Sequence, residues 1–138
     1  MEGKDLHSAL SMFQEIMFVI PLLSVASREA AKEIRELLEI CKEYVVALRI
    51  EISRRAASDP LKQAELAAVF TECKIQPIHM FFGLKVAIGC AFKVNNFKTA
   101  GFFCRKFLEM SQTQRLPKSM TASVPQVSHC SNCWSNFD

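Results

Sequence analysis

The sequence predicts an all-α protein, in which five helices form tetratricopeptide-like helix hairpins of an α-solenoid fragment and a disordered tail follows. Three observations predict this class. Half of the 138 residues are apolar, which is enough for the core of one domain, and 22% are charged. Apolar residues recur at helical spacing as far as Met110. Proline and asparagine residues interrupt that pattern between the predicted helices: Pro21, Pro60, Pro77, Asn95 and Asn96.

The first two predicted helices span residues 5–19 and 27–55. Pro21 ends the first. Ser27 is a favourable N-cap for the second, and Glu29 lies in its first turn, where the helix dipole favours a negative charge. The second helix carries expected charge pairs at i,i+4 spacing, Lys32 with Glu36 and Arg35 with Glu39. Its expected core stripe consists of Ile34, Leu37, Leu38, Cys41, Val45, Leu48 and Ile52.

The third and fourth predicted helices begin at prolines. Asp59 is the expected N-cap of a helix from Pro60 to Cys73. The fourth helix starts at Pro77 and is apolar nearly all round, since Lys85 is the only charge between residues 78 and 92. We therefore expect packing to cover it on several sides. Two isolated glycines on this helix are most simply explained by close packing: Gly83 and Gly89.

The fifth predicted helix follows Asn96 and shows a clear 3.6-residue stripe, formed by Phe97, Ala100, Cys104, Phe107 and Leu108. The small Ala100 lets a neighbouring helix come close. The first helix repeats this placement with Leu6, Ala9, Phe13, Ile16 and Met17, and such an internal repeat predicts stacked hairpins. The residues expected to form the packing contacts are Ala9, Phe13, Phe97, Ala100 and Cys104.

The composition changes after Met110. Residues 111–138 contain two prolines and many Ser, Thr, Gln and Asn residues without apolar periodicity. We expect a helical domain over residues 1–110 and a flexible polar tail over residues 111–138.

Few residues suggest chemistry. His129, Cys130 and Cys133 form a lone H-C-x-x-C, and a zinc site would need a fourth ligand from His79, His7 or an apolar-face cysteine. His79 is a general-base candidate, but no acid lies between it and Glu109, and a packed histidine is the simpler interpretation. Neither a G-x-S-x-G motif nor a glycine-rich phosphate loop is present. The sequence therefore predicts no enzyme, no metal, no cofactor and no small-molecule substrate.

The outer face of the fifth helix is the better candidate for function. Lys98, Phe102, Arg105 and Lys106 lie at i, i+4, i+7 and i+8, so one aromatic ring lies among three cations opposite the core stripe. Aromatic and arginine side chains are typical of protein interfaces, so this surface is a candidate for partner binding. The other interpretation, which the pattern favours slightly, is that Phe102 packs on a further helix of a longer solenoid; in both cases we expect the surface to be covered. Nucleic acid is a third interpretation, but no recognised motif supports it.

Four segments resemble, in order and at similar spacing, the C-terminal region of the alpha subunit of coatomer, the coat of COPI vesicles. The most specific residues are the Glu43-Tyr44-Val45 run, residues 67–71 (AAVFT), residues 76–79 (QPIH) and residues 96–100 (NFKTA). The resemblance covers residues 3–110, and the tail does not match it. His129, Cys130 and Cys133 are accordingly not equated with the cysteines of the family.

The resemblance implies a structural component of a vesicle coat in Golgi-to-endoplasmic-reticulum and intra-Golgi transport. It implies docking to other subunits of coatomer, namely epsilon and also beta-prime, in the cytoplasm and at the Golgi membrane periphery. The absence of a secretory signal and of an apolar run of about 18 residues agrees with a cytosolic protein. The alternatives are a free-standing helical adaptor and a truncated paralogue that no longer joins the coat.

Overall fold

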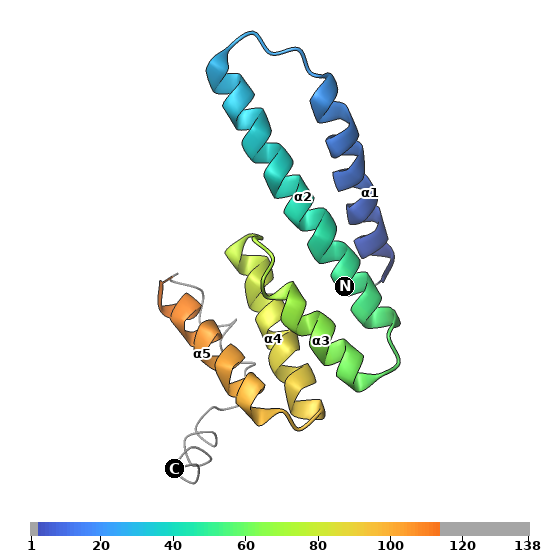
Figure 1. The fold of residues 1–138 in the computed structure, drawn as a ribbon, viewed down its shortest axis with the longest axis vertical. Helices are drawn as coiled ribbons and strands as arrows, with labels where there is room; N and C mark the ends of the chain where they lie inside the picture. The colour runs from blue at the N-terminus through green and yellow to red at the C-terminus, as the bar shows by residue number, and fades with distance from the viewer. Residues whose placement is uncertain (1–2, 114–138) are drawn as a thin grey trace. The chain divides into compact units, whose positions relative to one another are not determined.

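The structure, a computed structural model of the chain, describes residues 3–113. These residues form five α-helices and one short 3₁₀ helix, so the prediction of an all-α, five-helix chain is confirmed over this range (Figure 1). The chain divides between Gln76 and Pro77 into two compact units. Each unit is described by itself.

The first unit begins with an antiparallel hairpin of α1 (Gly3–Val19) and α2 (Arg28–Ala56), joined through the 3₁₀ helix η1 (Ile20–Leu22) (Figure 1). Pro21 lies inside η1, where its fixed φ suits the tight turn that ends α1. The two helices are joined by ring stacking: the rings of Phe13 and Tyr44 are 4.9 Å apart and nearly parallel, at 5°. The apolar core of the hairpin contains Leu6, Ile20, Cys41, Val45 and Ala47.

Two N-caps confirm the predicted helix starts in this unit. The Ser27 hydroxyl accepts a hydrogen bond from the Ala30 N–H at 3.1 Å. The Asp59 carboxylate accepts one from the Leu61 N–H at 3.1 Å, so α3 (Pro60–Phe70) begins at Pro60. The predicted end at Cys73 is wrong, because the backbone N–H groups of Thr71, Glu72 and Cys73 bond to carbonyls three residues back and tighten the chain into a turn.

Charge pairs stabilise both ends of α2. Lys32 pairs with Glu36 at 3.7 Å as predicted, whereas Glu39 pairs with Lys42 at 3.4 Å and not with Arg35. Near the C-terminus the half-buried Glu51 accepts hydrogen bonds from Arg54 and Arg55, each at 2.7 Å. Burial alone would raise the pKa of Glu51. The hydrogen bonds and positive charges of the two arginines outweigh it and hold the pKa below its ordinary value.

The second unit is an antiparallel hairpin of α4 (Pro77–Lys93) and α5 (Phe97–Thr113) (Figure 1). Asn95 adopts a left-handed conformation with φ 57°, which asparagine tolerates better than most residues. The Asn96 N–H donates to the Ala91 carbonyl at 2.9 Å and the Asn95 N–H to the Phe92 carbonyl at 3.0 Å, a Schellman ending for α4. The Asn96 side chain then accepts from the Thr99 N–H at 3.2 Å and caps α5. Two adjacent asparagines thus end one helix and start the next.

The hairpin core lies between α4 and α5, where the Phe81 and Phe107 rings meet edge to face with centroids 5.0 Å apart. The buried positions of α4 are Met80, Phe81, Gly83, Leu84, Ala87, Ile88, Cys90 and Ala91. The opposite side of α4 is open, with Ile78 45% and Phe82 52% exposed. The expectation that packing covers α4 on several sides agrees with these buried positions, and the side that carries Ile78 and Phe82 is not covered. Close packing does not explain Gly89, because apart from its chain neighbours and the adjacent helix backbone no described atom lies within 4 Å of a Cβ built there.

The predicted stripe of α5 is correct in its centre and wrong at its ends. Ala100, Cys104 and Phe107 are buried, and so is Phe103, which the stripe did not include. Phe97 is 57% exposed and Leu108 is 42% exposed. Phe97 is the first residue of the helix, and its ring lies at the edge of Phe92, with centroids 5.6 Å apart, and not in the core.

The proposed internal repeat does not correspond to equal packing positions. In α1 Leu6 is buried, while its counterpart Phe97 is exposed; Ile16 is 40% exposed, while its counterpart Phe107 is buried. Ala9 and Phe13 are half-buried.

Candidate partner-docking surface

The outer face of α5 presents the residues that the sequence predicted. Lys98 and Arg105 are exposed, Phe102 is 51% exposed, and Lys106 is half-buried. These side chains lie opposite the buried positions Ala100, Phe103, Cys104 and Phe107. We call Lys98, Phe102, Arg105 and Lys106 the α5 surface. Their placement on one accessible face is observed, and their binding to a partner stays a prediction.

The Phe102 ring contacts the ring of its chain neighbour Phe103. Its centroid lies 5.6 Å from that of Phe103 in an edge-on arrangement at 64°, and Phe103 itself is only 5% exposed. A half-exposed ring that already contacts a buried one has fewer orientations to lose when a partner binds. This arrangement suits an aromatic anchor.

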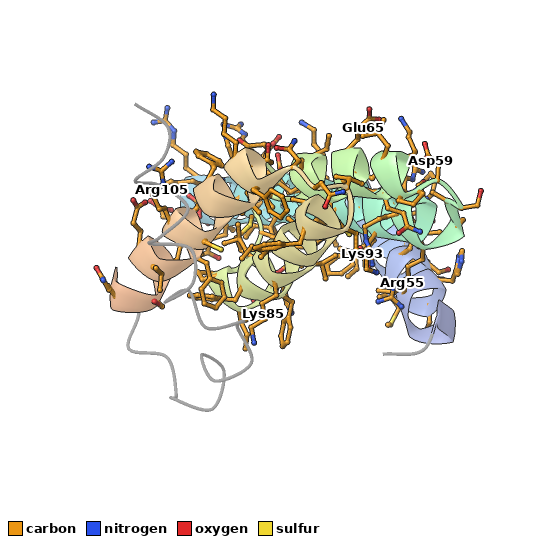
Figure 2. The ribbon with its side chains drawn as sticks, turned by 90° about the horizontal axis from the view of Figure 1, so that it is seen from below. Arg55, Asp59, Glu65, Lys85, Lys93 and Arg105 are labelled. Carbon is orange, nitrogen blue, oxygen red and sulfur yellow. The ribbon has the colours of Figure 1, made fainter. Side chains whose placement is uncertain are left out.

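The second unit is basic. Between Pro77 and Thr113 the only acidic residue is Glu109, against five cations: Lys85, Lys93, Lys98, Arg105 and Lys106. Figure 2 shows Arg105 extending from α5 and Lys85 extending from α4 on different sides of the hairpin. Cations therefore lie on both helices of the hairpin, and they favour partners that carry acidic side chains.

Sequence reasoning missed most of the exposed apolar surface. In the first unit the end of α1 and the following turn expose Phe18 by 79%, Leu22 by 83% and Val19 by 55%. In the second unit it missed Ile78 and Phe82. A signal was present, because six apolar or proline residues in a row at 18–23 cannot all face one neighbouring helix.

The candidates for chemistry remain dispersed. His79 is exposed on the first turn of α4. Over the part of the chain that the structure describes, no three metal-ligating side chains come together, and no helix is long and apolar enough to cross a bilayer. His129, Cys130 and Cys133 lie outside the described residues, as does the predicted flexible tail apart from the end of α5.

The described residues include four buried cysteines: Cys41, Cys73, Cys90 and Cys104. Burial raises the pKa of the Cys41 thiol. Burial, aided by the negative charges of Glu43 and Glu72, raises the pKa of Cys73. A raised pKa lowers the fraction of nucleophilic thiolate, so these two side chains behave as small apolar groups.

Comparison with known proteins identifies the family. A family model of the C-terminus of the coatomer (COPI) alpha subunit matches residues 1–131. Coatomer subunit alpha-3 of Oryza sativa subsp. japonica is 40% identical over 139 residues, which cover 99% of this chain and 11% of that protein. Coatomer subunit alpha-2 of the same plant is 46% identical over 102 residues, covering 73% of this chain and 8% of that protein.

A more distant relative agrees. Coatomer subunit alpha of Saccharomyces cerevisiae is 38% identical over 104 residues, covering 74% of this chain and 9% of that protein. The chain thus spans between 8% and 11% of the length of these three relatives. The family match continues past Met110 to residue 131, so the expectation that the resemblance stops at Met110 is wrong. The chain belongs to the coatomer alpha subunit family and matches its C-terminal region.

Proposed function

We propose that this chain is a structural, non-enzymatic docking module of the COPI vesicle coat. In this role it holds another coat subunit by helix packing and takes part in transport between the Golgi apparatus and the endoplasmic reticulum and within the Golgi. It acts in the cytoplasm and at the periphery of Golgi membranes. The partner is the epsilon subunit of coatomer, and beta-prime is a second coat neighbour.

One observation carries this proposal: Phe102 is half-exposed, in contact with a buried ring, and flanked by Lys98 and Arg105 on one helix face. Full burial of a phenylalanine side chain is worth about 1.5–3 kcal/mol, and half of that gain is still available to a partner at Phe102. The flanking cations add orientation and speed of association more than affinity. Membership of a coat-subunit family supports a coat partner.

The test is a pull-down of the purified epsilon subunit by the full chain, with two matched phenylalanine variants. Phe102→Ser removes the anchor on α5. Phe82→Ser is the control, because Phe82 has the same residue type and nearly the same exposure, 52%, on α4. We expect the wild type and Phe82→Ser to retain epsilon and Phe102→Ser to lose it.

Circular dichroism of each variant shows whether it keeps its helices. A well-folded wild-type monomer that does not retain epsilon would contradict the proposal and leave a free-standing adaptor as the function. Retention of epsilon by Phe102→Ser would show that α5 is not the docking face, and equal loss of binding in the two folded variants would show that docking is not specific to α5.

A further inference from the structure

We propose that the outer face of α4 is a second docking surface, which takes an amphipathic helix of a protein partner with acidic residues along its edges. The α4 surface consists of Ile78, Phe82 and Gly89, with Lys85 and Lys93 beside them. It is distinct from the α5 surface and requires no coat partner to be correct.

The α4 surface follows one side of the helix. Ile78, Phe82 and Gly89 lie at i, i+4 and i+11 on this side, and Lys85, at i+7, lies between Phe82 and Gly89. Ile78 is 45% exposed, Phe82 is 52% exposed, and Gly89 is exposed. At 1.5 Å per residue this surface is roughly 16 Å long, about three helical turns. A partner helix of that length covers it.

Gly89 indicates that the partner comes close. A glycine inside a helix destabilises it by about 0.5–1 kcal/mol relative to alanine, so its presence calls for a reason. Its backbone φ is not positive, and apart from its chain neighbours and the adjacent helix backbone no described atom lies within 4 Å of a Cβ built there, so neither strain nor packing inside the described structure requires glycine. A helix that crosses α4 at this point gains closer backbone contact from the missing side chain.

The lysines of α4 favour a partner helix with acidic side chains. Between the two ends of α4 the charged residues are Lys85 and Lys93, both cations; His79 is on the first turn, and no acid is present on this helix. A second copy of this chain would bring lysines against lysines across the contact, which is unfavourable. A helix with glutamate or aspartate along its edges meets both lysines with opposite charge while its small apolar stripe covers Phe82 and Gly89.

The experiment measures binding of two synthetic peptides to the full chain by fluorescence anisotropy. Each is an amphipathic helix of about 20 residues, long enough to be helical in solution, with an alanine and leucine stripe. One carries glutamate along both edges of the stripe, and the other carries lysine at the same positions. We expect the glutamate peptide to bind with a Kd on the order of 10 µM and the lysine peptide to bind at least about tenfold more weakly.

Variants of the chain locate the site. Gly89→Leu and Phe82→Ser should each weaken the glutamate peptide by about tenfold or more, and Phe102→Ser on α5 should leave it unchanged. Gly89→Ala gives the sharpest signature: it should raise the melting temperature, because alanine favours the helix, and at the same time weaken peptide binding. A merely structural glycine would not produce opposite effects on the two measurements.

Four results would overturn the proposal. They are equal binding of the two peptides, no binding of either at about 100 µM, loss of binding in Phe102→Ser alone, and a dimer in light scattering that Gly89→Leu dissociates. Binding of phosphatidylserine vesicles that Phe82→Ser abolishes, without binding of the glutamate peptide, would replace the protein partner by a membrane surface. Epsilon binding is tested with a variant at Phe102, and peptide binding is tested with variants at Phe82 and Gly89. A failure of the epsilon proposal can therefore be distinguished from a failure of this one.

Discussion

Replacing Phe107 by alanine tests which side of α5 forms the core. Phe107 is 2% exposed and meets Phe81 edge to face at a centroid distance of 5.0 Å. Truncation of a buried phenylalanine to alanine costs about 3–5 kcal/mol, since it removes the transfer free energy of the ring and leaves a cavity. About 0.5–1.5 kcal/mol of this is the specific ring-to-ring contact with Phe81.

The matched control is Phe102→Ala, five residues earlier on the same helix. Phe102 is 51% exposed, so truncation loses only about half of the 1.5–3 kcal/mol that full burial of the ring would give. The expected loss is about 1 kcal/mol, several times smaller than at Phe107. Residue type, helix propensity and element are the same in the two variants, so the difference reports burial alone.

The assay is urea unfolding followed by circular dichroism at the helix band, at equal protein concentration for all chains. A loss of about 3–5 kcal/mol is a large part of the stability of a small domain, so Phe107→Ala can unfold completely. Phe107→Leu then supplies a measurable intermediate loss of about 1–3 kcal/mol. Equal losses at Phe102 and Phe107, or a larger loss at Phe102, would refute the assignment of the core face.

Four further predictions use the same unfolding measurement. Ala100→Leu should destabilise the chain by about 1–3 kcal/mol, because Ala100 is fully buried and leucine overpacks its site; no loss would mean that α4 and α5 pack differently. Ser27→Ala should cost about 1 kcal/mol by removing the N-cap of α2, and Ser27→Gly only a few tenths. Gly89→Ala should stabilise by about 0.5–1 kcal/mol, since α4 is open there, and a loss would show that something covers the position. Because the pKa of Glu51 is lowered in the fold, its carboxylate stabilises the fold at pH values above its ordinary pKa, and this contribution is lost as the pH falls through the folded-state pKa. Glu51→Gln should therefore reduce the free energy of unfolding near neutral pH and make it depend less on pH in acid. If the free energy of unfolding of Glu51→Gln depends on pH as that of the wild type does, Glu51 does not contribute to the loss of stability in acid.

Local signals in the sequence predicted the helices well. Ser27 and Asp59 make the N-cap bonds that their residue types favour, and Pro77 starts α4 as expected. Such signals depend on a few neighbouring residues, so they can be evaluated from sequence alone. The end of α3 was harder to place, because its last turn is tightened by backbone bonds that no side-chain type specifies.

Tertiary contacts were predicted less well, and the errors have a common cause. Apolar periodicity identified Ala100, Cys104 and Phe107, but it also assigned Phe97 to the core and left out Phe103. Periodicity gives a stripe, while the position and width of the buried arc depend on where the neighbouring helix crosses. The exposed side of α4 could not be predicted either, because a helix that is apolar nearly all round has no polar face to identify its solvent-exposed side.

The candidate docking surfaces were also predicted only in part from the sequence. Lys98, Phe102 and Arg105 lie on the side of the helix opposite the predicted core stripe, and this was sufficient to place them on the outer face of α5. The burial of Phe103 beside the half-exposed Phe102 and the open space at Gly89 follow from the three-dimensional packing, and residue spacing does not specify either of them. Partner identity came from the family resemblance and not from either surface.

Calorimetric titration of the full chain with the purified epsilon subunit tests the proposed docking through the α5 surface directly. We predict saturable binding with a Kd of about 1 µM or tighter, and a Kd at least about tenfold weaker for Phe102→Ser. A folded, monomeric chain that gives no binding heat at about 100 µM epsilon, or a Phe102→Ser variant that binds as tightly as the wild type, would contradict it.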